Sequence, residues 1–289
     1  MGPETSGERK AQRPSTLESL RLAARQLYGA DAAGYDAGRP EYPDELYEIL
    51  VDQCGLRRGA RVLEIGPGTG RVTRRVLAHG ARVVAVEPDP AMADYLARAC
   101  AGGDVAIIAE TFEEAGLADD QFDLAIAGTS FHWVDQALGV PKLGRVVRPG
   151  GWAALWWTIF DDPGRQDPFR DAMRERLGDE DPAGQRRRSQ FQLDAAARRG
   201  DLERLGGFAD VSSRLIHWTA RLTSAELRAL YASQIEIRQL PPAEQQHVLN
   251  TVETIAAADF GGVVHRPFVT AMYTGRRLGV HYELLPDAG

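Results

Sequence analysis

The chain has 289 residues, of which 44% are hydrophobic and 26% are charged, a composition typical of a globular protein with a sizeable core. Its net charge of −7 disfavours a nucleic-acid partner, because such binding depends on a basic surface. With no membrane-length apolar run, no metal-ligand spacing, no signal-peptide pattern and two cysteines without a paired framework, we expect a cytoplasmic protein without a metal or a membrane partner.

Two segments precede the first predicted strand. Residues 1–14 are polar and contain two prolines, which predicts disorder. Ser15 and Glu18 form a capping-box pair that predicts the start of a first helix, and Pro43 predicts the start of a second. We expect residues 15–45 to cap the domain that follows.

A buried strand, a glycine-rich turn and a helix then follow one another directly. Residues 62–65 are apolar apart from Glu64, and Gly66, Gly68 and Gly70 come next at alternate positions. Glycines permit a tight turn and let a ligand approach the backbone closely. Strand, glycine turn and helix in this order predict the opening of a nucleotide-binding βαβ unit.

The acids around this turn indicate the kind of ligand. Arg71 stands where the dinucleotide fingerprint G-x-G-x-x-G requires a glycine. Glu64 would repel a pyrophosphate but attract a zwitterionic amino acid that carries a sulfonium. Glu87 ends the next predicted strand, residues 82–87, where a ribose diol would be bound. These features favour an adenosyl ligand without phosphates, and a nicotinamide-dependent oxidoreductase is the alternative.

The next elements alternate between strand and helix. Pro90 predicts the start of a helix, and short apolar runs predict strands over 105–109, 122–127 and 152–157. The turn over 148–151 leads sharply into the last of these strands. Such alternation predicts a parallel sheet with helices on both of its faces.

The C-terminal part changes in character. Residues 158–207 are charged and helical in pattern, which predicts a helical insertion after the fifth strand that acts as a lid. Strands are predicted over 211–221 and 268–276, with a helix over 242–258 between them. The basic run Arg186–Arg188 is typical of a solvated face, and the sequence does not tell whether it binds anything.

Four segments resemble the class I S-adenosylmethionine-dependent methyltransferases, of the type 11-like kind that acts on small molecules. They lie at 62–70, 84–92, 122–127 and 148–151, in the family's order and at strand–helix spacing. The resemblance implies an α/β fold with a Rossmann-like, doubly wound sheet of seven strands, mostly parallel, whose seventh strand runs antiparallel between the fifth and the sixth. It also implies S-adenosyl-L-methionine as the cofactor and S-adenosyl-L-homocysteine as the product.

The resemblance also implies roles for single residues. Glu64 would lie near the amino-acid end of the cofactor, Glu87 would accept hydrogen bonds from the ribose hydroxyls, and Pro88 or Met92 would flank the adenine. Thr111 stands, with the Phe112 amide, where the family often has an aspartate that reads the adenine amine, and Glu110 or Glu113 could substitute. The expected cofactor contacts are Arg39, Glu64, Gly66, Gly68, Gly70, Glu87, Pro88, Met92, Thr111, Phe112 and Ala127.

Candidate catalytic residues follow the fourth strand and precede the first. His132 could be a general base near the methyl group or a histidine that shapes the pocket, and Tyr35 could exchange a proton from the other wall. Phe131 and Trp133 could turn an aromatic face toward the sulfonium or anchor the loop in the core. Arg39 could pair with the cofactor carboxylate, with a substrate acid or with Asp36.

These residues predict methyl transfer to a small-molecule nucleophile by alignment and desolvation, with general-base help from His132. The alternative outside catalysis is a cofactor-binding regulatory or assembly protein, although the intact glycine loop with both acids argues against it. The acceptor atom and the oligomeric state, monomer or homodimer, stay open.

Overall fold

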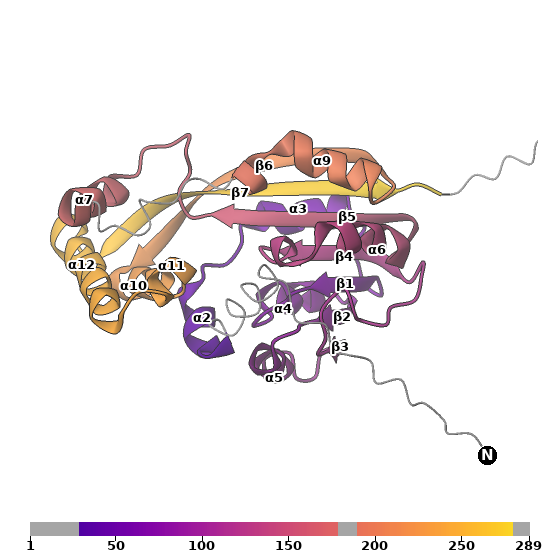
Figure 1. The fold of residues 1–289 in the computed structure, drawn as a ribbon, viewed down its shortest axis with the longest axis horizontal. Coiled ribbons are helices and arrows are strands. Elements are labelled where there is room, and N and C mark those ends of the chain that lie inside the picture. Colours follow the sequence, from indigo (N-terminus) through magenta and orange to yellow (C-terminus); the bar gives the residue numbers. More distant parts are fainter. Residues whose placement is uncertain (1–28, 179–189, 280–289) are drawn as a thin grey trace, which may run out of the picture.

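The computed structural model describes residues 29–178 and 190–279 of the chain (Figure 1). The predictions of disorder over 1–14, of a helix from Ser15 and of a solvated run over Arg186–Arg188 lie outside these residues. No helix in the described ranges has the length and apolar run that a membrane span requires.

The described elements form a seven-stranded sheet with the order β3-β2-β1-β4-β5-β7-β6. Neighbouring strands from β3 to β5 pair in parallel, and β7 runs antiparallel to both β5 and β6, which confirms the predicted fold. The strands are β1 Arg61–Ile65, β2 Arg82–Val86, β3 Val105–Ile108, β4 Phe122–Gly128, β5 Val147–Ile159, β6 Phe208–Thr223 and β7 Val263–Arg277.

Helices cover both faces of this sheet and extend beyond its edge. They are α2 Ala32–Gly38, α3 Asp44–Asp52, α4 Arg71–Ala78, α5 Pro90–Ala99, α6 Gln136–Val146, α7 Pro168–Leu177, α8 Gln190–Leu193, α9 Ala195–Arg204, α10 Ser224–Ala232, α11 Ile235–Arg238 and α12 Pro242–Phe260, with a short 3₁₀ helix over Phe131–Trp133. The helix predicted from Pro90 begins there as α5, with Asp89 as its cap, and Thr223 forms a capping box with Glu226 at the start of α10.

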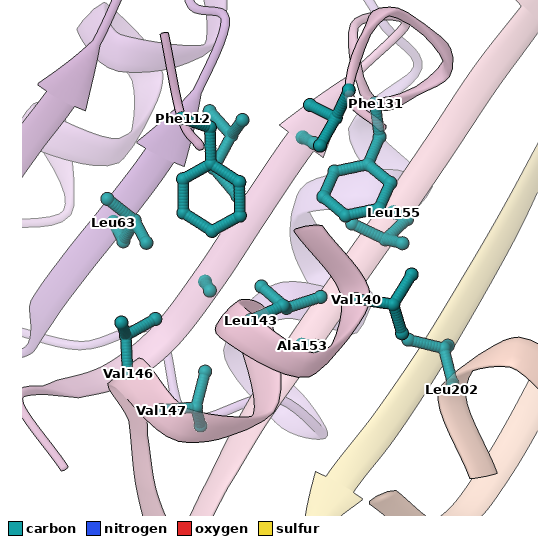
Figure 2. Close-up of a cluster of buried hydrophobic side chains, with 14 of the residues drawn as sticks. Leu63, Phe112, Phe131, Val140, Leu143, Val146, Val147, Ala153, Leu155 and Leu202 are labelled. Carbon is teal, nitrogen blue, oxygen red and sulfur yellow. The ribbon is translucent and has the colours of Figure 1, made fainter. Parts of the chain in front are cut away.

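Side chains of β1 alternate between two hydrophobic cores, one on each face of the sheet, because successive residues of a strand point to opposite faces. Leu63 belongs to the core on one face, in the same cluster as Leu143 of α6 and Leu202 of α9 (Figure 2). Val62 joins the core on the other face, under α3, α4 and α5, together with Leu96. The sheet therefore holds its strand ends at one rigid edge.

A third core lies at one end of the molecule, away from the parallel strands (Figure 1). Helices α7, α10, α11 and α12 pack there around the far ends of β6 and β7, and Phe169, Tyr231 and Phe268 are buried in this helical end. The predicted 158–207 insertion divides between two places, because α7 joins the helical end while α9 packs on β6 and β7.

Candidate active site

A cavity of about 490 Å³ lies at the carboxyl ends of β1, β2 and β4, where open α/β sheets bind their ligands. Its walls come from the glycine loop, from α2 and the segment after it, and from the helical end. A cavity of this size can hold a ligand of a few hundred daltons. Of the residues expected at the site, it brings together Tyr35, Arg39, Glu64, Gly66, Gly68, Glu87, Pro88, Met92, Phe112, His132 and Trp133.

The three loop glycines have different structural roles, although all three have positive φ angles. Gly68 lines the cavity, and a Cβ built there would meet nothing within 4 Å. A Cβ at Gly66 would lie 2.6 Å from the Ser130 Cβ, and one at Gly70 would lie 2.4 Å from the Leu96 Cδ1. Gly70 is the N-terminal cap of α4, lies outside the cavity wall and permits close packing. Of the three glycines, Gly68 leaves the backbone most open to a ligand.

Two buried carboxylates lie beside this loop. Glu64 is 2% exposed, its Oε2 accepts a hydrogen bond from Thr73 Oγ1 at 2.7 Å, and burial raises the pKa of its carboxyl to about 7. Glu87 accepts from the Gly68 N–H at 2.9 Å and from the Asp89 N–H at 3.0 Å. A carboxylate oxygen has two lone pairs, so a carboxylate can accept hydrogen bonds from several donors at once.

Asp36 ties α2 to the glycine loop. It accepts from Thr69 Oγ1 at 2.6 Å, and its Oδ1 lies 3.4 Å from Arg71 Nε. Arg71 also pairs with Glu41 at 2.7 Å. The arginine that interrupts the dinucleotide fingerprint therefore holds the preceding segment against the loop.

Arg39 does not pair with Asp36, which was one of its expected roles. Its Nη2 donates to the backbone oxygen of Ser233 at 2.9 Å, at the end of α10. Its guanidinium carbon lies 5.0 Å from the centroid of the Tyr35 ring and 4.9 Å from that of Phe160. Its Nε is buried without a hydrogen-bond partner. Arg39 thus joins α2 to the helical end.

His132 accepts a hydrogen bond through Nδ1 from the Trp157 indole N–H, at 3.0 Å. An indole N–H can only donate, so Nδ1 must carry a lone pair and the proton of the neutral ring is on Nε2. The ring of Trp133 packs beside it, with 4.7 Å between centroids. In this tautomer Nε2 presents a hydrogen-bond donor and has no lone pair with which to remove a proton.

At the expected adenine end, Thr111 departs from its expected role. Its hydroxyl donates to Glu114 Oε2 at 2.7 Å, and Thr111 does not line the cavity. Glu113 does line it: one carboxylate oxygen accepts from the Asp135 N–H at 2.7 Å, and the other is buried without a partner. Of the two acids considered as substitutes, Glu113 is the one that faces the cavity.

Ala127 and Phe131 also lie outside the cavity wall, contrary to the expected contacts. Both are buried in the core on the α6 face, where the Phe131 ring packs beside Phe112 with 6.3 Å between centroids (Figure 2). The 3₁₀ turn over Phe131–Trp133 separates the neighbouring side chains, so that Phe131 enters the core while His132 and Trp133 line the cavity.

Sequence reasoning missed several wall residues. Thr129 has a φ of +56°, and its hydroxyl lies 3.0 Å from that of Tyr42, whose pKa burial raises to about 12. The helical end adds residues from segments without any recognisable motif: Phe160, Asp161, Arg170, Trp218, Tyr231, Gln234, Glu236 and Arg266.

Within residues 29–178 and 190–279, no group of three or more His, Cys, Asp and Glu side chains is arranged to hold a metal ion. Cys54 and Cys100 are both free and buried.

Comparisons with known proteins agree with this geometry. A family model described as a methyltransferase domain matches residues 63–155. An uncharacterised methyltransferase of Mycobacterium tuberculosis is 39% identical over 135 residues, which are 47% of this chain and 53% of the relative. A methyltransferase-like protein of Schizosaccharomyces pombe is 28% identical over 237 residues, 80% of this chain and 86% of the relative. The chain spans about half the length of the curated mycobacterial relatives that it matches.

Solved structures support the fold. A type II methyltransferase structure from Anaeromyxobacter dehalogenans has a TM-score of 0.63 at 22% identity, over 83% of this chain and 98% of that one. A phosphoethanolamine N-methyltransferase from Haemonchus contortus, in complex with S-adenosyl-L-methionine, has a TM-score of 0.55 at 11% identity, over 92% and 61%. The chain thus carries a methyltransferase domain over residues 63–155, and its sheet order, glycine loop and two acids are similar to those of the class I S-adenosyl-L-methionine-dependent methyltransferases.

Proposed function

We propose that the chain transfers the methyl group of S-adenosylmethionine to a small-molecule nucleophile. The observation that carries the proposal is the single cavity that joins the glycine loop and its two acids to an aromatic wall in the helical end. One part of this cavity suits the cofactor, and the other leaves room for an acceptor beside it. Small molecules fit a cavity of this volume better than a folded macromolecule does.

The residues of the first part fit the cofactor. Gly68 leaves space for close approach, Glu87 offers a buried carboxylate to the ribose hydroxyls, and Glu64 offers another to the cationic amino-acid end. Pro88 and Met92 are in position to flank the adenine, and the unpartnered oxygen of Glu113 can accept from its amine. When bound, the cofactor supplies the activated methyl group and the leaving group.

The chain's own contribution is alignment and the exclusion of water. The hydrogen bond from Trp157 supports a role for His132 as a donor through Nε2, and it argues against the general-base role expected from the sequence. Tyr35 and Trp133 line the same cavity and would position the acceptor.

We also propose that the N-terminal cap and part of the predicted lid close the site. The Asp36 contacts support α2 as the described part of the cap, because they hold it against the glycine loop. Among the parts of the predicted lid, α7 belongs to the helical end that faces the acceptor side, and α9 covers the sheet instead.

The test is isothermal titration calorimetry with S-adenosylhomocysteine, with NAD as a second ligand. We expect S-adenosylhomocysteine to bind the wild type and NAD not to bind. Gly68→Arg should weaken binding by at least about 100-fold, close to 3 kcal/mol, because the side chain fills the cavity. Gly102→Arg is the matched control, since Gly102 also has a positive φ with open space around it but lies outside the cavity.

Binding of NAD, or equal affinity in Gly68→Arg and the wild type, would refute the proposed cofactor site. Binding of the cofactor without methylation of any small molecule would favour the alternative of a regulatory or assembly protein. A cytoplasmic location, the absence of a nucleic-acid partner and a monomeric or homodimeric state stay predictions from the sequence.

A further inference from the structure

The cavity wall contains four arginines, and three of them are neutralised. Arg71 pairs with Asp36 and Glu41, Arg170 pairs with Asp161, and Arg266 pairs with Asp167. Arg39 is different, because no carboxylate of the described residues lies within 4 Å of its guanidinium. Among the described arginines of the cavity wall, Arg39 is therefore the one without a carboxylate partner.

The surroundings of Arg39 suit an anion. One nitrogen donates to the Ser233 backbone, which fixes the side chain, while Nε–H is buried without a partner. The rings of Tyr35 and Phe160 lie near the guanidinium and limit its contact with water. A fixed guanidinium with an unused donor is well suited to bind a carboxylate.

The side chain of Arg39 is held on the side of the helical end. Besides Tyr35 of α2, its side chain contacts Ser233 at the end of α10 and Phe160 after β5, both next to the helical end. The contacts between α2 and the glycine loop run instead through Asp36. A negatively charged group that pairs with the Arg39 guanidinium would therefore be part of the acceptor.

His132 adds an independent requirement. It is the histidine of the described cavity wall, and the donor from Trp157 leaves its proton on Nε2. A nucleophile that must lose a proton would find no basic imidazole nitrogen there. A nucleophile that is already ionised at neutral pH needs none, and a carboxylate meets this requirement.

We propose that the acceptor is a carboxylic acid, held as its carboxylate by Arg39 and methylated on that group to give a methyl ester. This inference rests on the proposed function. The aromatic side chains of Tyr35, Phe160 and Trp218 in the same wall indicate an apolar or aromatic body for the acid.

The step balances without a proton. A carboxylate oxygen forms a bond to the methyl carbon with one of its lone pairs, and the carbon–sulfur bond breaks with its electron pair kept on sulfur. The sulfonium becomes a neutral thioether, and the carboxylate becomes a neutral ester. No oxidant, reductant or base takes part.

The experiment uses the full chain saturated with S-adenosylhomocysteine and measures binding of benzoate, phenylacetate, cinnamate and octanoate, each against its primary amide. We expect at least one acid to bind at least about tenfold more tightly than its amide. Arg39→Gln should lower the affinity for that acid by at least about tenfold, while it changes the affinity for S-adenosylhomocysteine by less than about threefold. With S-adenosylmethionine, the bound acid should give an alkali-labile methyl ester, detected by mass spectrometry.

Arg165→Gln is the matched control, because Arg165 also donates to a backbone oxygen, that of Trp218, but lies outside the cavity wall. It should bind the acid as the wild type does. If Arg39→Gln does not fold, Arg39→Lys takes its place, since it keeps the charge and loses the planar donor group.

Three results would overturn the inference. They are binding of S-adenosylhomocysteine without binding of any acid, equal binding of acids and amides, and loss of S-adenosylhomocysteine affinity in the Arg39 variants. The last would assign Arg39 to the cofactor carboxylate. All three leave the proposed function standing, whereas failure of the wild type to bind S-adenosylhomocysteine would remove both.

Discussion

The indole nitrogen of Trp157 donates to Nδ1 of His132 over 3.0 Å, and this contact decides where the imidazole proton resides. Trp157→Phe removes the donor and keeps most of the ring volume. We expect the neutral His132 ring of the wild type to carry its proton on Nε2, and the variant to populate both tautomers, because neither nitrogen is then preferred. Long-range ¹⁵N–¹H correlation spectra of histidine-labelled protein report the tautomer directly.

His217 serves as the internal control for this measurement. Its Nδ1 lies 2.6 Å from Asp162 Oδ2, which holds a proton on Nδ1. The two histidines should therefore give opposite patterns in the wild type, and only that of His132 should change in the variant. A proton on Nδ1 of His132 in the wild type would restore the general-base hypothesis.

Alanine substitutions at two loop glycines should separate packing from ligand access. Gly70→Ala places a Cβ at 2.4 Å from the Leu96 Cδ1 on a backbone with φ +84°, so we expect a loss of roughly 2–4 kcal/mol in the free energy of unfolding. Gly68→Ala meets open space at φ +58° and should cost only about 1–2 kcal/mol.

Ligand binding should show the reverse order of sensitivity. Gly68→Ala should weaken S-adenosylhomocysteine binding directly, since its methyl group enters the cavity wall, whereas Gly70→Ala should bind nearly normally at temperatures where it stays folded. Urea unfolding and calorimetry measure the two effects. Equal loss of stability in the two variants would contradict the packing role assigned to Gly70.

The buried carboxyl of Glu64 predicts a pH dependence of stability. Its pKa is raised from 4.5 to about 7 in the folded chain, so between these values the folded state binds more protons than the unfolded state. The contribution of Glu64 to the free energy of unfolding is therefore highest below pH 4.5 and falls as the pH rises toward 7. Glu64→Gln has no such proton to lose and should lack this decline.

Urea unfolding at several pH values from about 4.5 to about 8 tests this prediction. The free energy of unfolding of Glu64→Gln should increase relative to that of the wild type as the pH rises. Glu48→Gln, at an exposed position of α3, is the control and should follow the wild type. A constant difference between wild type and Glu64→Gln would show that Glu64 titrates normally in the folded chain.

The ion pair between Arg266 and Asp167 should be essential to the helical end. Both side chains are buried, with 2.6 Å between Arg266 Nε and Asp167 Oδ2, and Asp167 also caps α7. Asp167→Ala leaves the guanidinium buried without its counter-charge, so we expect a loss of about 3–5 kcal/mol in unfolding free energy. Asp171→Ala breaks the exposed pair with Arg174 and should cost about 0–1 kcal/mol. Similar losses in the two variants, measured by urea unfolding, would argue that the buried charge is solvated.

Local features of this chain were predictable because local sequence decides them. Strand periodicity, the capping box at Thr223 and Glu226, and Pro90 at the start of α5 depend on residues a few positions apart. The glycine turn with Glu64 and Glu87 at the strand ends is equally local, since a parallel sheet brings the carboxyl ends of its strands to one edge.

The sequence by itself thus determined the order of elements, the sheet they form and the edge that carries the glycine loop and the two acids. Only the tertiary structure decided that Gly70 packs on Leu96 and that Arg71 pairs with Asp36. The same structure decided that the Trp157 indole fixes the imidazole proton of His132 on Nε2. It also decided that Arg39 meets the end of α10, nearly two hundred residues away. These contacts join residues far apart in the chain, and no short-range pattern specifies them, because their geometry exists only once the sheet and the helical end have packed together.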